Sequence, residues 1–235
     1  MPDPASVHPT NLMNPSSLPQ KARPTTVFLV DDHPVVRDGL AEAINHEPDL
    51  AVCGAAEDRQ AALRAIETNQ PRLVIIDLML KASSGLDLIK DIRAHWPELL
   101  ILVVSMHDEN LYAERVLRAG AQGYITKQQA TRDILVAIRR VLAGGIYLNE
   151  PTASIVLSRL AKPQAAGRSP MDCLADRELQ VFELTGQGLN TREIATQLGI
   201  DMKTVETYRI RIKEKLHLQS ASELLQLAIR WNKDR

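Results

Sequence analysis

Carboxylates stand at the ends of two short apolar runs in this sequence. The run at 27–30, VFLV, is followed directly by Asp31 and Asp32, and the run at 73–76, LVII, is followed by Asp77. Adjacent like charges repel, so the Asp31-Asp32 pair costs stability unless a positive group compensates it. Carboxylate oxygens are hard ligands suited to Mg²⁺, and a carboxylate can also be the nucleophile that accepts a phosphoryl group.

Two more apolar runs end in groups that fit the same chemistry. ILVV at 101–104 leads into Ser105, and GYIT at 123–126 leads into Lys127. If these runs are parallel strands, their carboxyl ends form one crevice, which is where open parallel sheets bind ligands. Three carboxylates, a hydroxyl and one ammonium then meet, and the metal and Lys127 can neutralise phosphoryl oxygens.

A plainer interpretation exists for each carboxylate alone. Asp31 and Asp32 could cap a helix that begins near Pro34, because Asp before a proline-led first turn is common. Asp77 could be an ordinary loop residue. The coincidence of four strand ends favours the shared site.

The elements that must position these groups form a regular alternation. Short apolar runs predict strands at 27–30, 50–56, 73–76, 101–104 and 123–126, and helical patterns predict helices at 34–46, 57–69, 85–95, 109–119 and 131–143. Five strand-helix repeats indicate a parallel sheet covered on both faces. Residues 1–24 hold six prolines and are expected to be a disordered tail.

The alternation stops near Gly144-Gly145 and gives way to helices. A helical piece at 152–161 and a Pro-, Gly- and Ala-rich stretch at 162–170 precede helical patterns at 176–186, 191–198, 202–217 and 221–231. The predicted fold class is therefore α/β plus all-α. The predicted division is a tail at 1–24, a first domain at 25–145, a linker at 146–171 and a helical domain at 172–235.

The stretch 190–218 predicts helix, turn, helix. Asn190 or Thr191 can cap the first helix with Glu193 as its partner, Gly199 permits the turn, and Asp201 can cap the second helix. Helical spacing buries one face of 202–217, made of Val205, Tyr208, Ile212 and Leu216, and exposes the other, made of Lys203, Glu206, Thr207, Ile210, Arg211 and Glu214.

That exposed face favours DNA over an ordinary solvated surface. Residues 203–217 hold five Lys or Arg against two Glu, whereas 172–235 is balanced at ten against ten. Ile210 is apolar on a face where a solvated helix prefers a polar residue, and it can meet a thymine methyl in the major groove.

The composition limits which other classes of protein this chain could belong to. The 235 residues are 45% hydrophobic and 24% charged, with a net charge of −1, which suits a globular chain and gives no overall sign of nucleic acid. Cys53 and Cys173 suggest neither a disulfide framework nor a zinc site. We see no membrane span and no signal peptide, and we expect a cytoplasmic protein.

Residues 25–145 resemble the receiver domain of bacterial response regulators, of flavodoxin-like (βα)5 fold with a five-stranded parallel sheet. The match includes VDDHPVVRDGL, LVIIDLML with Gly85 eight residues after Asp77, LVVSMHDE and RAGAQGYITK, and the last two resemble the NarL/FixJ subfamily. The resemblance implies that Asp77 accepts phosphate from a sensor histidine kinase. It further implies that Asp32 and Asp77 bind Mg²⁺, with Asp31 acting through water and Met79 through its carbonyl. The switch positions would be Ser105 and Tyr124, and Lys127 would pair with the phosphate.

The helical domain is similar to the four-helix LuxR-type helix-turn-helix domain. LADREL at 174–179, GLNTREIATQLGI at 188–200 and KTVETYRIRIKEKL at 203–216 carry the likeness. It implies a recognition helix at 202–216. By this resemblance we expect contacts to base edges from Glu206, Thr207 and Ile210. The candidates for phosphate contact are Lys203, Thr204, Arg211 and Lys213.

This sequence departs from the usual pattern of these families at four positions. Receivers usually have Met and Pro where Leu80 and Lys81 stand, and Pro where Gln128 stands. The helix-turn-helix family usually has His where Tyr208 stands. His33 and His107 flank the pocket and are interpreted as structural or steering residues, since Mg²⁺ prefers oxygen.

We therefore expect a DNA-binding response regulator and not an enzyme. An aspartyl-phosphate phosphatase would need an acid two residues after its nucleophile, where Met79 stands. A phosphate-independent regulator would not need the intact acidic set. The expected partners are a sensor histidine kinase, promoter repeats in double-stranded DNA and a second copy, with RNA polymerase as a further candidate.

In the expected mechanism a phosphoryl group at Asp77 draws Ser105 toward it and Tyr124 swings inward. The surface of the fourth helix and fifth strand then changes, which favours dimers and frees the DNA-binding domain. In the helical domain the expected dimer contact is the last helix, through Leu224, Leu225, Leu227 and Ala228.

Overall fold

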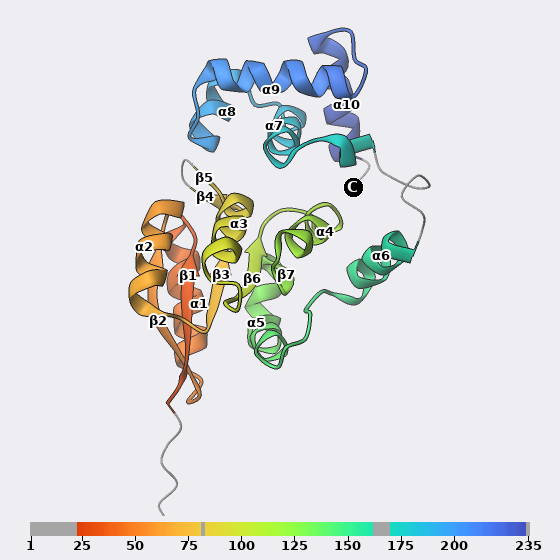
Figure 1. Ribbon diagram of the computed structural model, residues 1–235. Coiled ribbons are helices and arrows are strands. Elements are labelled where there is room, and N and C mark those ends of the chain that lie inside the picture. The colour runs from red at the N-terminus through yellow and green to blue at the C-terminus, as the bar shows by residue number, and fades with distance from the viewer. Residues whose placement is uncertain (1–22, 81–82, 162–169, 234–235) are drawn as a thin grey trace, which may run out of the picture.

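A computed structural model describes residues 23–80, 83–161 and 170–233. The expected disordered tail thus falls almost wholly outside the described residues. Within them lies the predicted parallel sheet, in the order β2-β1-β3-β6-β7 (Figure 1). Its strands are β1 (Thr25–Val30), β2 (Leu50–Ala56), β3 (Leu73–Ile76), β6 (Leu100–Ser105) and β7 (Gly123–Thr126). The fold class predicted from the repeats is confirmed.

Alternate residues of each strand feed two separate cores. Val27 and Leu29 pack with helices α1 and α5 on one face, while Phe28 and Val30 pack with α2, α3 and α4 on the other. These helices are α1 (Pro34–Asn45), α2 (Arg59–Asn69), α3 (Gly85–His95), α4 (Glu109–Ala119) and α5 (Lys127–Leu142). Because strand side chains alternate across the sheet, a continuous apolar run serves both faces at once.

Two local features near the strand ends differ from the prediction. Helix α5 begins at Lys127 and not at 131, because the Thr126 side chain accepts a hydrogen bond from the Gln129 N–H in a capping box. A short hairpin, β4 (Met79–Leu80) and β5 (Ser83–Ser84), follows β3. The next residue, Gly85, packs so tightly that a Cβ there would collide with the Asp77 carbonyl oxygen. The glycine thus lets α3 start against the end of β3.

The C-terminal region is helical as predicted. It contains the 3₁₀ turn η1 (Pro170–Cys173) and helices α7 (Asp176–Gly186), α8 (Thr191–Leu198), α9 (Met202–Lys215) and α10 (Ala221–Lys233). Asn190 and Glu193 form the predicted capping box of α8, Gly199 ends it in the left-handed region with φ 62°, and the Asp201 side chain caps α9. These caps confirm the helix-turn-helix.

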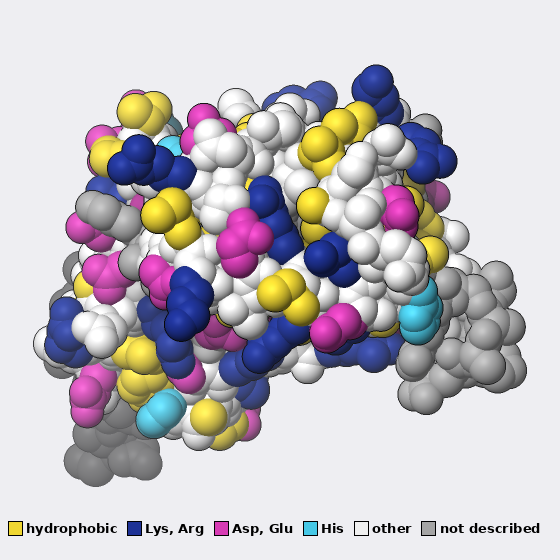
Figure 2. Space-filling model, turned by 90° about the horizontal axis from the view of Figure 1, so that it is seen from above, with side chains coloured by type: hydrophobic (Ala, Val, Ile, Leu, Met, Phe, Trp, Pro, Cys, Tyr) yellow, Lys and Arg dark blue, Asp and Glu magenta, His cyan; other side chains and the backbone are white. Residues whose placement is uncertain are grey.

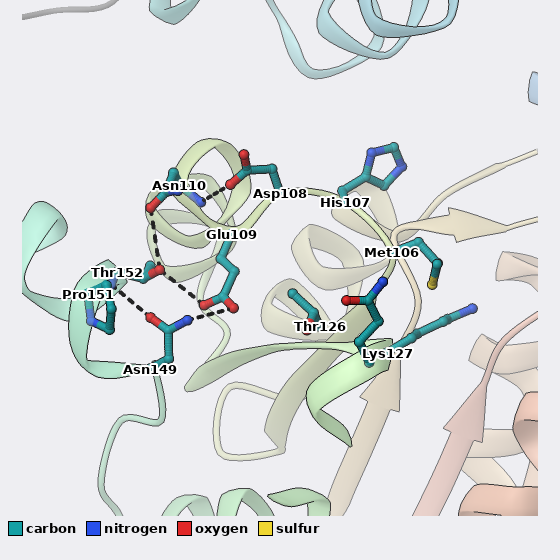
Figure 3. A pocket seen from close by; sticks show the side chains of 11 residues that line it. Met106, His107, Asp108, Glu109, Asn110, Thr126, Lys127, Asn149, Pro151 and Thr152 are labelled. Carbon is teal, nitrogen blue, oxygen red and sulfur yellow. Dashed lines mark hydrogen bonds between the residues drawn. The ribbon is translucent and has the colours of Figure 1, made fainter. Parts of the chain in front are cut away.

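Helix α6 (Glu150–Ala161) lies within the predicted linker and packs along α4. The Glu109 carboxylate, at the start of α4, accepts hydrogen bonds from the Asn149 amide at 2.8 Å and the Thr152 hydroxyl at 3.1 Å (Figure 3). The surface of the fourth helix, which we expected to change and pair on phosphorylation, is therefore partly covered by α6. The boundaries 25–145, 146–171 and 172–235 stay predictions.

Among the described residues no helix combines the length and the apolar character that crossing a membrane requires.

Candidate functional site

The carboxyl ends of β1, β3 and β7 bring an ammonium between two carboxylates. Lys127 Nζ lies 2.7 Å from Asp77 Oδ2 and 2.7 Å from Asp31 Oδ2. Asp31 is 4% exposed and Asp77 is 3% exposed, so both charges are removed from water. A pair of buried carboxylates is tolerated only when a cation or hydrogen bonds compensate it, and Lys127 supplies that compensation.

Burial and the ion pairs of Lys127 act in opposite directions on the pKa values of this cluster. Burial raises the pKa of Asp77, against the opposing influence of Lys127 and the Ser105 hydroxyl. Burial by itself lowers the pKa of Lys127, but the carboxylates of Asp77 and Asp31 outweigh it and the pKa is raised. The lysine therefore stays an ammonium at neutral pH.

Asp32 sits at the more open side of the cluster. Its Oδ1 atom is buried and accepts no hydrogen bond from any described residue, although His33 Nδ1 lies 2.8 Å away. Oxygens of Asp31, Asp32 and Asp77 and a ring nitrogen of His33 all lie within 4.8 Å of one another. An orphaned carboxylate oxygen among hard oxygen donors is the environment that Mg²⁺ fits.

The plainer interpretation of Asp31 and Asp32 as helix caps is wrong. His33 occupies the N-cap of α1 and makes no side-chain cap bond, while Pro34 leads the helix. Asp31 instead accepts a hydrogen bond from the His33 N–H at 2.8 Å. The half-buried Met79 follows Asp77 closely, with its N–H 3.4 Å from Asp77 Oδ1.

The two expected switch residues, Ser105 and Tyr124, are both fully buried. The Tyr124 hydroxyl donates to the His107 carbonyl oxygen at 2.8 Å, and the His107 N–H lies 3.4 Å from Ser105 Oγ. We expected Tyr124 to swing inward after phosphorylation, but it is already inward here. The inward swing of Tyr124 on phosphorylation stays a prediction, and starting from this arrangement the change would come from the β6–α4 loop.

A cavity of about 350 Å³ opens beside that loop (Figure 3). It is lined by Met106, His107, Asp108, Glu109, Asn110, Thr126, Lys127, Gln128, Asn149, Pro151 and Thr152. The Glu109 carboxylate and its partners line one side of the cavity, and Lys127, whose Nζ pairs with Asp31 and Asp77, lies on the other side. The loop thus lies between the acidic cluster and helix α6.

The second candidate surface is the outer face of α9, which lies on the side of the helical domain away from the sheet (Figure 1). Lys203, Glu206, Thr207, Ile210 and Arg211 are exposed, and Thr204 and Lys213 are half-buried. Ile210 is 51% exposed although it is apolar. Figure 2 looks onto this side of the molecule, where Lys and Arg side chains are spread among polar and apolar ones.

Several of these side chains already have partners. The Thr204 hydroxyl donates to the capping carboxylate of Asp201 at 2.7 Å, and the Thr207 hydroxyl donates to the Lys203 carbonyl at 2.9 Å. Glu206 accepts from the Thr191 hydroxyl at 2.6 Å. Thr204 and Glu206 thus help to position α9 as well as lining its outer side.

The sequence did not reveal the role of Arg209. Its guanidinium donates to Thr191 Oγ1 at 2.8 Å and to Glu206 Oε1 at 3.3 Å, which ties α8 to α9. The spacing of 206 and 209 on one helix could have indicated an i,i+3 pair, but the partner on α8 could not be found that way.

The apolar surface expected on the last helix is smaller than predicted. Leu224 is 2% exposed and Ala228 is fully buried, because both pack into the core of their own helical bundle. Leu225 is 40% exposed. The prediction that Leu224 and Ala228 are free for a dimer contact is therefore wrong.

Comparison with known proteins places both regions. Residues 27–139 match the family described as "Response regulator receiver domain", and residues 172–228 match "Bacterial regulatory proteins, luxR family". The transcriptional activator protein ExaE of Pseudomonas putida is 38% identical over 207 residues, covering 86% of this chain and 95% of that protein. The oxygen regulatory protein NreC of Staphylococcus carnosus is 33% identical over 209 residues, covering 87% and 96%.

Solved structures agree with this placement. RcsB from Salmonella enterica serovar Typhimurium, bound to promoter rprA with the phosphomimetic BeF3⁻, superposes with a TM-score of 0.60 at 26% identity, covering 87% of this chain and 98% of that one. A LuxR-family response regulator from Aurantimonas superposes with a TM-score of 0.55 at 31% identity, covering 59% and 99%. The chain belongs to the two-component response regulators that join a receiver domain to a LuxR-type DNA-binding domain. It is a DNA-binding regulator of transcription.

Proposed function

We propose that Asp77 is the phosphoacceptor of this response regulator. The observation that carries the proposal is the buried Asp77 carboxylate, which lies 2.7 Å from Lys127 at the carboxyl ends of the strands. When a phosphohistidine of the kinase donates, its P–N bond breaks and an Asp77 oxygen forms the new P–O bond. Lys127 and the Ser105 hydroxyl lie where they can neutralise and bind the transferred oxygens.

Mg²⁺ belongs in this proposal because the donor set fits it. Asp32 and Asp77 would hold the ion directly, Asp31 through water, and Met79 through its carbonyl. When bound, the ion offsets the negative charge of the incoming phosphoryl group. The exposed imidazole of His33 stands at the edge of the cluster, where it can steer or order the carboxylates.

The proposed signal runs from Asp77 through Ser105 into the β6–α4 loop. A phosphoryl group binds the Ser105 hydroxyl and draws the loop toward the acidic cluster. The Tyr124 ring is already inward, so it acts as a fixed wall and its hydroxyl follows the His107 carbonyl. The chain is regulated by this shift of populations and catalyses no reaction on another substrate.

At the DNA, we propose that α9 enters the major groove of promoter repeats. Thr207 and Ile210 carry the base reading, with Glu206 shared between base reading and helix positioning. Lys203, Thr204, Arg211 and Lys213 are proposed for phosphate contact. One module this small offers little surface for specificity, so we propose a homodimer on two half-sites.

The partners proposed are a sensor histidine kinase, double-stranded DNA and a second copy, and RNA polymerase stays a further candidate. A regulator that binds chromosomal DNA works in the cytoplasm, which is the location we propose.

The test begins with a DNA sequence selected from a random pool by the full chain. Binding to that DNA is then measured before and after treatment with acetyl phosphate and Mg²⁺. We expect treatment to tighten binding on a two-site DNA. A chain that takes up phosphate and binds this DNA with unchanged affinity would contradict the proposal.

A further inference from the structure

The turn between β1 and α1 places an imidazole beside the acidic cluster. His33 precedes Pro34, and a residue before proline is held away from helical backbone. Its backbone is accordingly extended, with φ −94° and ψ 108°, and it occupies the N-cap of α1. The His33 N–H donates to Asp31 Oδ1 at 2.8 Å, which keeps this residue close to the carboxylates that follow β1.

One ring nitrogen of His33 faces two carboxylates at once. His33 Nδ1 lies 3.1 Å from Asp31 Oδ1 and 2.8 Å from Asp32 Oδ1. The contact with Asp31 has the geometry of a hydrogen bond, whereas Asp32 Oδ1 is buried and accepts no hydrogen bond from any described residue. A single nitrogen thus stands beside two oxygens, and the second oxygen stays uncompensated.

Lys127 does not compensate that oxygen, because it pairs with other atoms of the cluster. Its Nζ lies 2.7 Å from Asp31 Oδ2 and 2.7 Å from Asp77 Oδ2. The cluster therefore has a lysine side, made of these two Oδ2 atoms, and a histidine side, made of Asp31 Oδ1, Asp32 Oδ1 and His33 Nδ1. Within the described part of the chain, no lysine or arginine pairs with Asp32, so the histidine side lacks a full positive charge.

The spacing on the histidine side suits ligands of one ion. Two ligands at right angles around an ion, each about 2.1 Å from it, lie about 3 Å apart. The two nitrogen–oxygen distances, 3.1 and 2.8 Å, are close to that value. One donor atom from each of Asp31, Asp32, His33 and Asp77 lies within 4.8 Å of the others, so all four side chains can reach the same ion.

An imidazole among carboxylates changes which ions a site prefers. Mg²⁺ favours oxygen ligands and keeps several of its waters, so a nitrogen donor adds little to its binding. Imidazole suits iron, nickel, copper and zinc ions, and the affinity of nitrogen and oxygen sites for divalent transition ions rises from Mn²⁺ to Cu²⁺. The carboxylates of the cluster can therefore serve either class of ion, whereas His33 serves the second class.

We propose that His33 Nδ1 is a ligand for divalent transition ions at this site, so that a transition ion and Mg²⁺ compete for the carboxylates of Asp31 and Asp32. Toward Mg²⁺ the ring orders the carboxylates, and toward a transition ion it supplies a nitrogen donor. The inference rests on the proposed function, because it takes the acidic cluster to be the metal site of the phosphoacceptor. The choice between the two classes of ion then depends on one side chain.

Calorimetric titration of the full chain with Co²⁺ and with Mg²⁺ tests the inference. Co²⁺ accepts nitrogen ligands, and its visible absorption reports which atoms surround it. His33→Leu removes the donor, and because 63% of the His33 side chain is exposed, the change leaves the core intact. In this variant the Co²⁺ affinity should fall about tenfold or more, while the Mg²⁺ affinity should stay within about twofold of the wild type.

Two comparisons keep other Co²⁺ sites out of the measurement. The chain has six histidines, so only the Co²⁺ that excess Mg²⁺ displaces is counted. His46→Leu removes an exposed imidazole at the C-cap of α1, the opposite end of the same helix, and should leave both affinities unchanged. Asp32→Asn should weaken the binding of both ions, because its carboxylate serves either class.

The absorption of the bound Co²⁺ is a readout that a purely structural role of His33 would not change. An imidazole nitrogen splits the d orbitals of Co²⁺ more strongly than a carboxylate oxygen does. The visible band of the displaceable Co²⁺ should therefore differ between the wild type and His33→Leu, and should be the same in the wild type and His46→Leu.

The possible failures are distinguishable. Equal losses of Co²⁺ and Mg²⁺ affinity in His33→Leu, or an unchanged Co²⁺ affinity and spectrum, would overturn the nitrogen ligand. A wild type that binds neither ion would overturn it as well and would remove the metal from the proposed function. A wild type that binds both ions as described but takes no phosphate would defeat the proposed function, whereas the assignment of His33 would stand.

Discussion

Lys127 Nζ lies 2.7 Å from Asp77 Oδ2, across a distance of 50 positions in the chain. The same ammonium bridges to Asp31, so one buried cation holds two buried carboxylates. This bridge makes the acidic cluster tolerable without metal. It also places a positive group where a phosphoryl oxygen on Asp77 would lie.

Removal of Lys127 should destabilise the receiver domain. In Lys127→Met the Asp31 and Asp77 carboxylates stay buried without their cation, which costs about 3–5 kcal/mol when a buried pair loses one partner. Thermal unfolding should show the loss, and added Mg²⁺ should recover more stability in the variant than in the wild type. Lys233→Met, an exposed change at the end of α10, is the control. If Lys127→Met and Lys233→Met unfolded at the same temperature, the bridge would contribute nothing to the stability of the receiver domain.

Removal of Asp32 should have the opposite effect on the metal-free protein. Asp32 Oδ1 is buried without a hydrogen bond, and its charge adds to that of Asp31. Asp32→Asn should therefore raise the free energy of unfolding by about 1 kcal/mol and weaken Mg²⁺ binding at least roughly tenfold. Calorimetric titration with Mg²⁺ measures the second effect, with the exposed Asp38→Asn as the control. Unchanged Mg²⁺ affinity would remove Asp32 from the ligand set.

The local parts of the fold could be predicted because they depend on short stretches of chain. The strands are apolar runs, and the caps at Asn190 and Asp201 act on amides two or three residues away. The sequence pattern places the start of α5 at 131 and not at Lys127, because the first turn of this helix has no apolar periodicity. The signal that could have found it is the spacing of Thr126 and Gln129 as a capping box.

The contacts between domains could not be predicted in this way. Tyr112 and Glu183 are separated by 71 positions, and each belongs to a helix whose pattern is satisfied without the other. A carboxylate in the middle of an amphipathic helix is normally solvated, so the sequence pattern assigns Glu183 to water. The inward position of Tyr124 is likewise a matter of packing around His107, which no local pattern reports.

Two kinds of loss should be distinguishable on α9. Lys203→Ala should weaken binding to all DNA and reduce the salt dependence by about one unit of slope per lost phosphate contact. Ile210→Ala should cost roughly 1–3 kcal/mol on the selected DNA and little on random DNA. Fluorescence anisotropy on both DNAs at several salt concentrations separates the two. Equal weakening on both DNAs by Ile210→Ala would show that Ile210 does not read bases.

The connection between α8 and α9 should depend on Thr191. Thr191→Val removes the donor to Glu206 and the acceptor of Arg209, whose Nε is already buried without a partner among the described residues. The loss should be about 1–2 kcal/mol of domain stability, with weaker DNA binding as a consequence. Thr196→Val on the same helix, whose hydroxyl only bonds back to the Arg192 carbonyl, is the matched control for both melting and DNA titration. Equal behaviour of the two variants would show that this network does not position α9.

The most direct test of the account is the site of phosphorylation. The full chain, Asp77→Asn and the surface control Asp38→Asn are each treated with acetyl phosphate and Mg²⁺ and separated on a phosphate-affinity gel. We expect a shifted band for the wild type and for Asp38→Asn, and no shifted band for Asp77→Asn, because among the described residues Asp77 is the carboxylate that contacts both Lys127 and Ser105 and lies among the metal donors. Full labelling of Asp77→Asn would contradict it.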